Sequence, residues 1–315
     1  MARRPRKYSA NSAYAEVQRT VDRQFLFKPD PTIRNIIGAC AGRALRKFPV
    51  KLFWLDFNIN HRQVGRTALS DSPEHIQNLA RFDQLFNSLL ARELNRHHDH
   101  RDGALYSTRN RSQECVDDRS LEQQLLYAVT NVVKDGLVDR VAHWKGVSSY
   151  NQLATGDRDR YRYVNWTRWW SAGGPRSKRS PEDFVEWVEV ELSPLPSWAG
   201  MKPAQRQALF RRLVRQLEQD IREERELEGR RVMGPRKLAK VDPRDRPRER
   251  KPRTRQPLCH ASRASGRRQY EQDWREFLRE YYAASARYRC GEWDVEFPAG
   301  TFRPPLIEVY PTVPA

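Results

Sequence analysis

Residues 125–138, LLYAVTNVVKDGLV, form the second half of an apolar helix and the point at which it stops. Gly136 fits the glycine that commonly follows the last helical turn. Tyr127 and Asn131 are four residues apart, so a helix places both on one side. The pair has two interpretations: the polar rim of a packed core, or a tyrosine nucleophile beside a metal ligand.

The segments before this helix alternate between strand and helix patterns. Residues 12–27 predict an edge-type strand and a turn, and residues 29–48 predict a helix. Aromatic and branched residues in 49–64 predict a strand, which we expect to be central. The Ser-Pro pair at 72–73 opens a further helix, and residues 104–116 lead through a loop into another strand.

Composition and pattern divide the chain into four parts: a domain at 1–165, a helical extension at 166–228, a basic linker at 229–268, and a C-terminal helix with an extended tail at 269–315. The linker carries 15 Lys and Arg against 3 Asp and Glu, so its net charge is 15 − 3 = +12. Its proline-rich part, residues 230–257, lacks periodicity, and we expect it to be disordered when unbound. A capping box, Ser120-x-x-Gln123, is expected to open the helix that carries Tyr127.

The charge balance indicates the class of partner. The 315 residues include 58 Lys and Arg and 40 Asp and Glu, a formal net charge of +18. Such an excess favours a polyanion, with nucleic acid ahead of a membrane surface. No stretch approaches the ~18 apolar residues of a membrane span, the basic N-terminus lacks a secretory signal, and the four cysteines form no CxxC pair. We therefore expect a cytoplasmic, nucleoid-associated protein with no membrane partner.

Polar side chains on the strand at 49–64 complete a candidate site. Asn60-His61-Arg62-Gln63 places His61 and Gln63 on the same face, because side chains alternate along a strand. One imidazole nitrogen and the carboxamide oxygens of Gln63 and Asn131 can form a site for a hard divalent cation. A neighbouring Tyr127 could attack a phosphate that the cation polarises.

These residues resemble the REP-associated tyrosine transposases, which belong to the HUH single-strand DNA endonucleases. The segments that carry the resemblance are Asn60-His61-Arg62-Gln63, at the position of the family's N-H-x-H strand, a Y-x-x-x-N helix followed by G-L-V at 127–138, and a Trp…Ser-Ser-Tyr segment at 144–150. The resemblance covers about residues 8–153. It implies an α+β fold of the ferredoxin-like class, an antiparallel sheet with packed helices, followed here by a helical C-terminal extension.

The resemblance also implies an activity in DNA transposition and recombination. Tyr127 would attack a phosphodiester of single-stranded or hairpin DNA, leaving a 5′-phosphotyrosine link and a free 3′-hydroxyl. Mg²⁺ or Mn²⁺ would be held by His61 and by Gln63, which takes the place of the family's second histidine, with Asn131 assisting. Arg62 stands where the family has a bulky apolar residue, and Val132 stands where it has a proline.

Three interpretations follow from these features. The first is an active transposase-like endonuclease, and the second is a non-catalytic DNA-binding relative with a degenerate metal site. Gln63 and Arg62 are the residues that separate them. The third is a structural or protein-interaction factor, which only the C-terminal extension favours. The sequence leaves the DNA target and the oligomeric state open, with a homodimer as one option.

Further DNA contacts are expected from basic and aromatic residues outside the metal site. Arginines after a glycine loop can hold phosphates or form an exposed basic loop, and tryptophans can stack on bases, at ~1–3 kcal/mol each, or pack against the sheet. The histidines at 97, 98 and 100 are interpreted as a solvated helix end rather than a metal site. The candidate DNA-binding residues are Arg109, Arg111, Lys134, Arg168 and Trp169.

Overall fold

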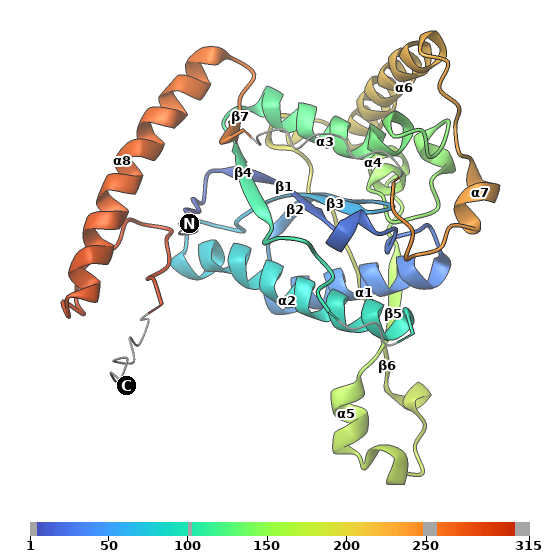
Figure 1. Cartoon of the computed structure of the whole chain (residues 1–315), viewed down its shortest axis with the longest axis horizontal. Helices are drawn as coiled ribbons and strands as arrows, with labels where there is room; N and C mark the ends of the chain where they lie inside the picture. Colours follow the sequence, from blue (N-terminus) through green and yellow to red (C-terminus); the bar gives the residue numbers. More distant parts are fainter. Residues whose placement is uncertain (1–4, 100–102, 248–256, 306–315) are drawn as a thin grey trace, which may run out of the picture.

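The computed structural model describes residues 5–99, 103–247 and 257–305, and these form a mixed α+β fold. A five-stranded, mainly antiparallel sheet lies between two sets of helices (Figure 1). Its strands run in the order β2-β3-β1-β4-β7, and only β7 is parallel to its neighbour. The strands are β1 (Ala13–Arg19), β2 (Lys51–Asn58), β3 (His61–Thr67), β4 (Arg111–Cys115) and β7 (Cys259–His260).

Helices α1 (Pro31–Lys47) and α2 (Pro73–His97) cover one face of the sheet (Figure 1). The other face is covered by α3 (Asp118–Lys134), on which α6 packs. No helix of the described residues has the length and apolar character that a membrane span needs. The remaining elements are α4 (Tyr150–Thr155), α5 (Trp166–Ser171), α6 (Pro203–Leu227), α7 (Pro235–Ala239), α8 (Ala264–Arg289), β5 (Arg160–Val164) and β6 (Val185–Glu189).

The sheet separates two apolar cores, because successive side chains of a strand point to opposite faces. The core on the α1/α2 side includes Tyr14 of β1, and the core on the α3 side includes Ala15. Residues beyond 165 contribute to both cores, with Val188 in the first and Phe210 in the second. The residues beyond 165 therefore pack against the helices that cover both faces of the sheet, β6 on α1 and α6 on α3.

The strand assignments for the N-terminal third need two corrections. The stretch predicted as an edge-type strand is β1, which lies in the middle of the sheet between β3 and β4. The stretch at 49–64 is a hairpin rather than one central strand, and β2 forms the edge. The turn between β2 and β3, at residues 59–60, contains neither glycine nor proline, so the sequence pattern did not indicate it. Asn58 supports the turn instead, because its side-chain oxygen accepts from the Ile59 N–H at 2.6 Å.

Helix α3 begins and ends on recognisable caps. Its N-cap is Asp117, whose carboxylate accepts from the Ser120 N–H at 2.7 Å. The expected capping box at Ser120 and Gln123 is therefore one turn too late, because Asp117 already satisfies the first free amide groups. At the other end Gly136 has a φ of +67° and donates to the Val133 carbonyl at 3.0 Å, as the motif predicted.

The structure describes residues 230–247 and 257 of the segment that is expected to be disordered when unbound, and 248–256 lie outside the described residues. Met233 N–H donates to the Gly136 carbonyl at 2.7 Å, which attaches the segment just beyond the end of α3. Leu238 of α7 is buried in the core on the α3 side. A few apolar residues among the arginines are sufficient to dock this segment, although its average composition is that of an unfolded chain.

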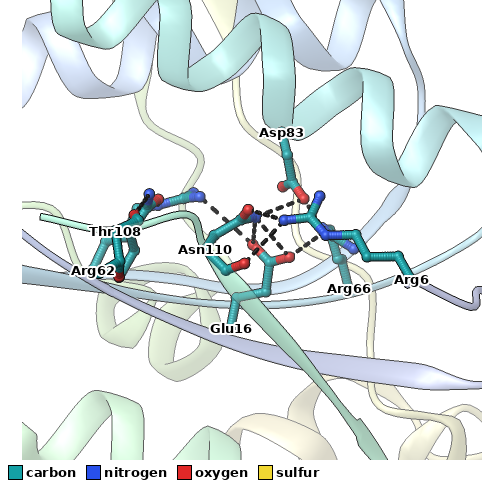
Figure 2. Close-up of polar contacts among 8 residues, drawn as sticks. Arg6, Glu16, Arg62, Arg66, Asp83, Thr108 and Asn110 are labelled. Carbon is teal, nitrogen blue, oxygen red and sulfur yellow. Dashed lines mark hydrogen bonds and ion pairs between the residues drawn. The ribbon is translucent and has the colours of Figure 1, made fainter. Parts of the chain in front are cut away.

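A buried ionic network lies between the sheet and α2 (Figure 2). Arg66 of β3 forms ion pairs with Glu16 of β1 and Asp83 of α2, and all three side chains are buried. Burial alone would raise the pKa of Glu16, but the charges of Arg66 and Arg62 outweigh it and lower this pKa to about 2. Burial raises the pKa of Asp83 to about 6 against the opposing charge of Arg66. The network joins β1, β3 and α2 on the face of the sheet opposite to His61.

Arg62 belongs to this network and not to the candidate metal site. Its Nε donates to Gln18 at 3.2 Å, and its guanidinium lies 5.1 Å from the ring centroid of Phe86. The side chain is fully buried on the α2 side of β3, opposite to His61 and Gln63. The guanidinium packs over the rings of Phe86 and Tyr106, so Arg62 does not alter the face of β3 that carries His61 and Gln63.

Candidate active site

The structure brings the three predicted metal ligands together between β3 and α3. The carboxamide nitrogen of Asn131 lies 2.6 Å from His61 Nε2. The carboxamide nitrogen of Gln63 lies 3.5 Å from the same imidazole nitrogen. All three side chains are buried, so the two amides converge on a single ring nitrogen at the bottom of the site.

Asn60 determines which nitrogen of His61 is available. The Asn60 side-chain oxygen lies 2.9 Å from His61 Nδ1, and because this oxygen only accepts, we assign the ring proton to Nδ1. Nε2 then carries a lone pair that faces Asn131. Burial, with the nearby charge of Arg19, lowers the pKa of His61 to about 3. The imidazole is therefore neutral at physiological pH, which is the form that binds a metal.

Tyr127 lies one helical turn before Asn131 and is 43% exposed, so a substrate can reach its hydroxyl. The Lys134 ammonium lies 5.5 Å from the centroid of its ring. Burial and the charge of Asp135 raise the pKa of Tyr127, while Arg19 lowers it. The phenol is thus protonated in the absence of substrate, and a nucleophilic role needs further positive charge next to the reacting oxygen.

Basic side chains surround this site on the same face of the sheet. Arg19 pairs in register with His61, and Arg111 of β4 pairs with Val17, the residue of β1 opposite Gln63. Arg19, Arg111 and Lys134 are exposed, and none forms an ion pair with another described residue. Arg109 is exposed in the loop before β4. The face that carries Tyr127 therefore offers positive charge to a polyanion.

The structure does not bring Arg168 and Trp169 to this site. Helix α5, which carries both, lies beyond α1 and α2, on the side of the sheet away from α3 (Figure 1). Arg168 lies 3.5 Å from Glu186, and the Trp169 indole donates to the Arg179 carbonyl at 3.2 Å. Trp169 also packs edge-on against Trp166 and Trp170. These tryptophans therefore lie away from Tyr127.

His97 and His98 lie at the C-terminal end of α2, as the last helical residue and the C-cap. His98 Nε2 donates to the Leu26 carbonyl at 3.1 Å, and His97 packs beside it. His100 lies outside the described residues. Within the described part of the chain, no group of three His, Cys, Asp or Glu side chains could hold a metal ion.

Two residues at the site were not found from the sequence: Arg19 and Asp135. The Asp135 carboxylate accepts from the Asn58 amide at 2.7 Å, which joins the end of β2 to the end of α3. Arg19 stands across from His61 because β1 pairs antiparallel with β3, a pairing between distant segments that no local pattern indicates.

Comparison with known proteins gives one distant likeness. No family model matches this chain, and no curated protein matches it. Among solved structures, a REP-associated tyrosine transposase bound to a REP hairpin is similar in 50% of this chain and 87% of its own. The sequence identity is 15% and the TM-score is 0.39. A likeness of this degree does not assign a function.

Replacing Asp135 by asparagine is expected to lower the pKa of Tyr127, because the Asp135 charge raises it. The amide oxygen can still accept from Asn58, so the local structure is retained. The measurement is an NMR titration of protein that carries labelled tyrosine, with Tyr127 assigned from the Tyr127→Phe variant. Asp118→Asn, at the far end of α3, is the matched control. An unchanged or raised Tyr127 pKa in Asp135→Asn contradicts this placement of charge.

Proposed function

We propose that this chain is a transposase-like endonuclease of single-stranded DNA, with Tyr127 as its nucleophile. The observation that carries this proposal is the position of an exposed tyrosine one helical turn from Asn131, whose amide contacts a buried, neutral His61. The net charge of +18 and the unpaired basic side chains around the site support a nucleic acid as the partner. A DNA strand bearing a hairpin is the proposed substrate.

The proposed reaction is a transfer of one phosphodiester. The phenolic oxygen of Tyr127 forms a bond to phosphorus as the bond from phosphorus to the 3′-oxygen breaks. The phenolic proton leaves to solvent, and the departing 3′-oxygen takes up a proton. The products are a 5′-phosphotyrosine and a 3′-hydroxyl, which can rejoin by the reverse steps because the link keeps the phosphoester bond.

The residues at the site fit a divalent cation such as Mn²⁺ or Mg²⁺. They offer one imidazole nitrogen from His61 and, with their amides turned, the oxygens of Gln63 and Asn131. When bound, such an ion would supply positive charge to the phosphate oxygens. All three donors are neutral, so the ligands themselves add no negative charge to hold the ion. The substrate phosphate is the natural source of that charge.

The scaffold supports the same proposal. The elements β1-α1-β2-β3-α2-β4 occur in the order of the ferredoxin-like motif. Their strands lie in the order β2-β3-β1-β4, and all three pairings are antiparallel. Helix α3 follows β4 and covers the face that α1 and α2 leave open. We propose that this arrangement is what presents Tyr127 to a DNA strand that crosses the sheet.

A second candidate is a DNA-binding relative without catalysis. Gln63 favours it, because a carboxamide 3.5 Å from His61 replaces an imidazole in the proposed ligand set. The two candidate functions differ in whether a covalent protein–DNA adduct forms. The full-length protein is incubated with a single-stranded oligodeoxynucleotide that contains a hairpin, together with Mn²⁺, and run on a denaturing gel. A covalent protein–DNA band supports the endonuclease, whereas bound but intact DNA in a native gel, without that band, supports the second candidate.

Exchanging Gln63 for histidine is expected to lower the Mn²⁺ concentration needed for half-maximal cleavage by roughly tenfold, because an imidazole is a stronger ligand than an amide. His61→Ala is expected to remove the dependence on Mn²⁺ together with the activity. Cleavage rates are measured across a Mn²⁺ titration, and circular dichroism verifies that both variants fold. A His61→Ala protein that keeps the wild-type Mn²⁺ response contradicts the ligand assignment.

A further inference from the structure

Arg19 occupies a specific position at the end of β1. Its neighbour Gln18 extends toward Arg62 on the α2 side of the sheet, so alternation directs Arg19 toward α3. It pairs in register with His61, and paired residues of an antiparallel ladder share a face. The side chain is exposed. A positive charge therefore stands beside the polar cluster, at the open surface of the site.

The geometry places Arg19 next to both parts of the site. It pairs in register with His61, which Asn131 of α3 contacts, and Tyr127 lies one helical turn before Asn131. Its charge also opposes the rise that burial and Asp135 cause in the pKa of Tyr127. Arg19 thus stands close to the space that a phosphate must enter to meet Tyr127.

Arg19 also differs from exposed arginines elsewhere in the chain. On the β5–β6 ribbon, Arg160 lies 3.4 Å from Glu189 and Arg158 lies 2.6 Å from Glu191. Arg19 forms no ion pair with another described residue. Its positive charge can therefore meet an anion that enters the site.

We infer that Arg19 binds the phosphate that Tyr127 attacks. Its planar guanidinium can donate two hydrogen bonds to the non-bridging oxygens of a phosphodiester. As the Tyr127 oxygen approaches, negative charge grows on those oxygens, and a donor already in place stabilises it. No bond to Arg19 forms or breaks. This inference rests on the proposed function. Arg19 supplies a positive charge that the neutral ligands His61, Gln63 and Asn131 cannot supply.

The test first separates binding from cleavage. Arg19→Ala, Arg19→Lys and Arg160→Ala are each made in a Tyr127→Phe background, and binding of a fluorescein-labelled single-stranded oligodeoxynucleotide is followed by anisotropy at several salt concentrations. Arg19→Ala is expected to weaken binding roughly tenfold and to flatten the plot of log affinity against log salt by about 0.7, the value of one phosphate contact.

Arg19→Lys and Arg160→Ala test whether the effect depends on the shape of the side chain and on its position. Arg19→Lys keeps the charge and is expected to keep the salt slope while losing part of the affinity, because an ammonium cannot form the two-pronged contact. Arg160→Ala, which removes an exposed but paired arginine, is expected to change neither. An Arg19→Ala protein with the slope and affinity of Arg160→Ala overturns the inference.

Cleavage assays with Tyr127 intact then separate this inference from the proposed function. Arg19→Ala is expected to slow adduct formation by about 100-fold, with partial recovery in Arg19→Lys. If wild type forms the adduct but Arg19→Ala binds and cleaves normally, the inference fails and the proposed function stands. If wild type forms no adduct while Arg19→Ala loses one phosphate contact, the proposed function fails and Arg19 remains a phosphate-binding residue.

Discussion

Replacing Tyr127 by phenylalanine is expected to reduce covalent adduct formation by a factor of roughly a thousand or more, because the lost oxygen is the atom that bonds to phosphorus. Binding of single-stranded DNA should stay within about twofold, because the ring and its contact with Lys134 are retained. The hydroxyl belongs to a side chain that is 43% exposed, so its loss should leave stability nearly unchanged.

Tyr150→Phe is the matched control for this variant. Tyr150 is a partly buried tyrosine at the start of α4, on the same side of the sheet, and its ring packs at a tilt against Phe210. The control should form the adduct at the wild-type rate. Single-turnover cleavage on labelled hairpin DNA gives the rates, and anisotropy gives the affinities. A Tyr127→Phe protein that still forms the adduct would assign the nucleophile to another residue.

Replacing Arg66 by methionine is expected to lower the free energy of unfolding by about 3–5 kcal/mol. The substitution leaves Glu16 and Asp83 buried without the guanidinium that both contact (Figure 2). Asn110 still donates to Asp83 at 2.9 Å, but a neutral amide cannot replace the lost charge. Urea unfolding measures the loss. The control is Arg34→Met, which breaks a half-exposed pair with Asp159 and should cost less than about 1 kcal/mol.

The effect of Arg66→Met should depend on pH. The pKa of Glu16 is lowered from 4.5 to about 2 in the folded protein, so its contribution to stability is present above pH 4.5 and is lost as the pH falls toward 2. Without Arg66 less positive charge opposes the burial of Glu16, although Arg62 remains, so its pKa rises above the wild-type value and the variant takes up a proton before wild type does. The difference in stability between the two proteins should therefore shrink from neutral pH to acid pH. A difference that is constant with pH contradicts a charged network.

Local patterns in the sequence predicted the core of the candidate site. The spacing of Tyr127 and Asn131 on a helix and the period of His61 and Gln63 on a strand are properties of a few neighbouring residues. The structure brings His61, Gln63 and Asn131 into one cluster, because each element adopts the period that its sequence predicts. The glycine stop at Gly136 was found for the same reason.

Features that depend on pairing between distant segments were not predicted. Whether β1 is central or an edge depends on β3 and β4, which the pattern of residues 12–27 does not contain. In the sequence Arg62 is a departure from the pattern of the strand that carries His61, but its side chain pairs with Glu16 on the opposite face of the sheet. Residues 230–247 were expected to be unfolded from composition, yet Leu238 finds a hydrophobic pocket next to α3 that only the tertiary fold creates.

The central claim, that Tyr127 attacks single-stranded DNA, is tested most directly by locating the attachment point. Wild-type protein is incubated with Mn²⁺ and a hairpin-bearing single strand, the adduct is digested with trypsin and nuclease, and the peptides are analysed by mass spectrometry. Trypsin cuts after Arg119 and Lys134, and Tyr127 is the only tyrosine in the peptide between them. The account predicts a 5′-phosphonucleotide on that peptide, at Tyr127. An adduct on any other residue, or DNA that is bound but never linked, would contradict it.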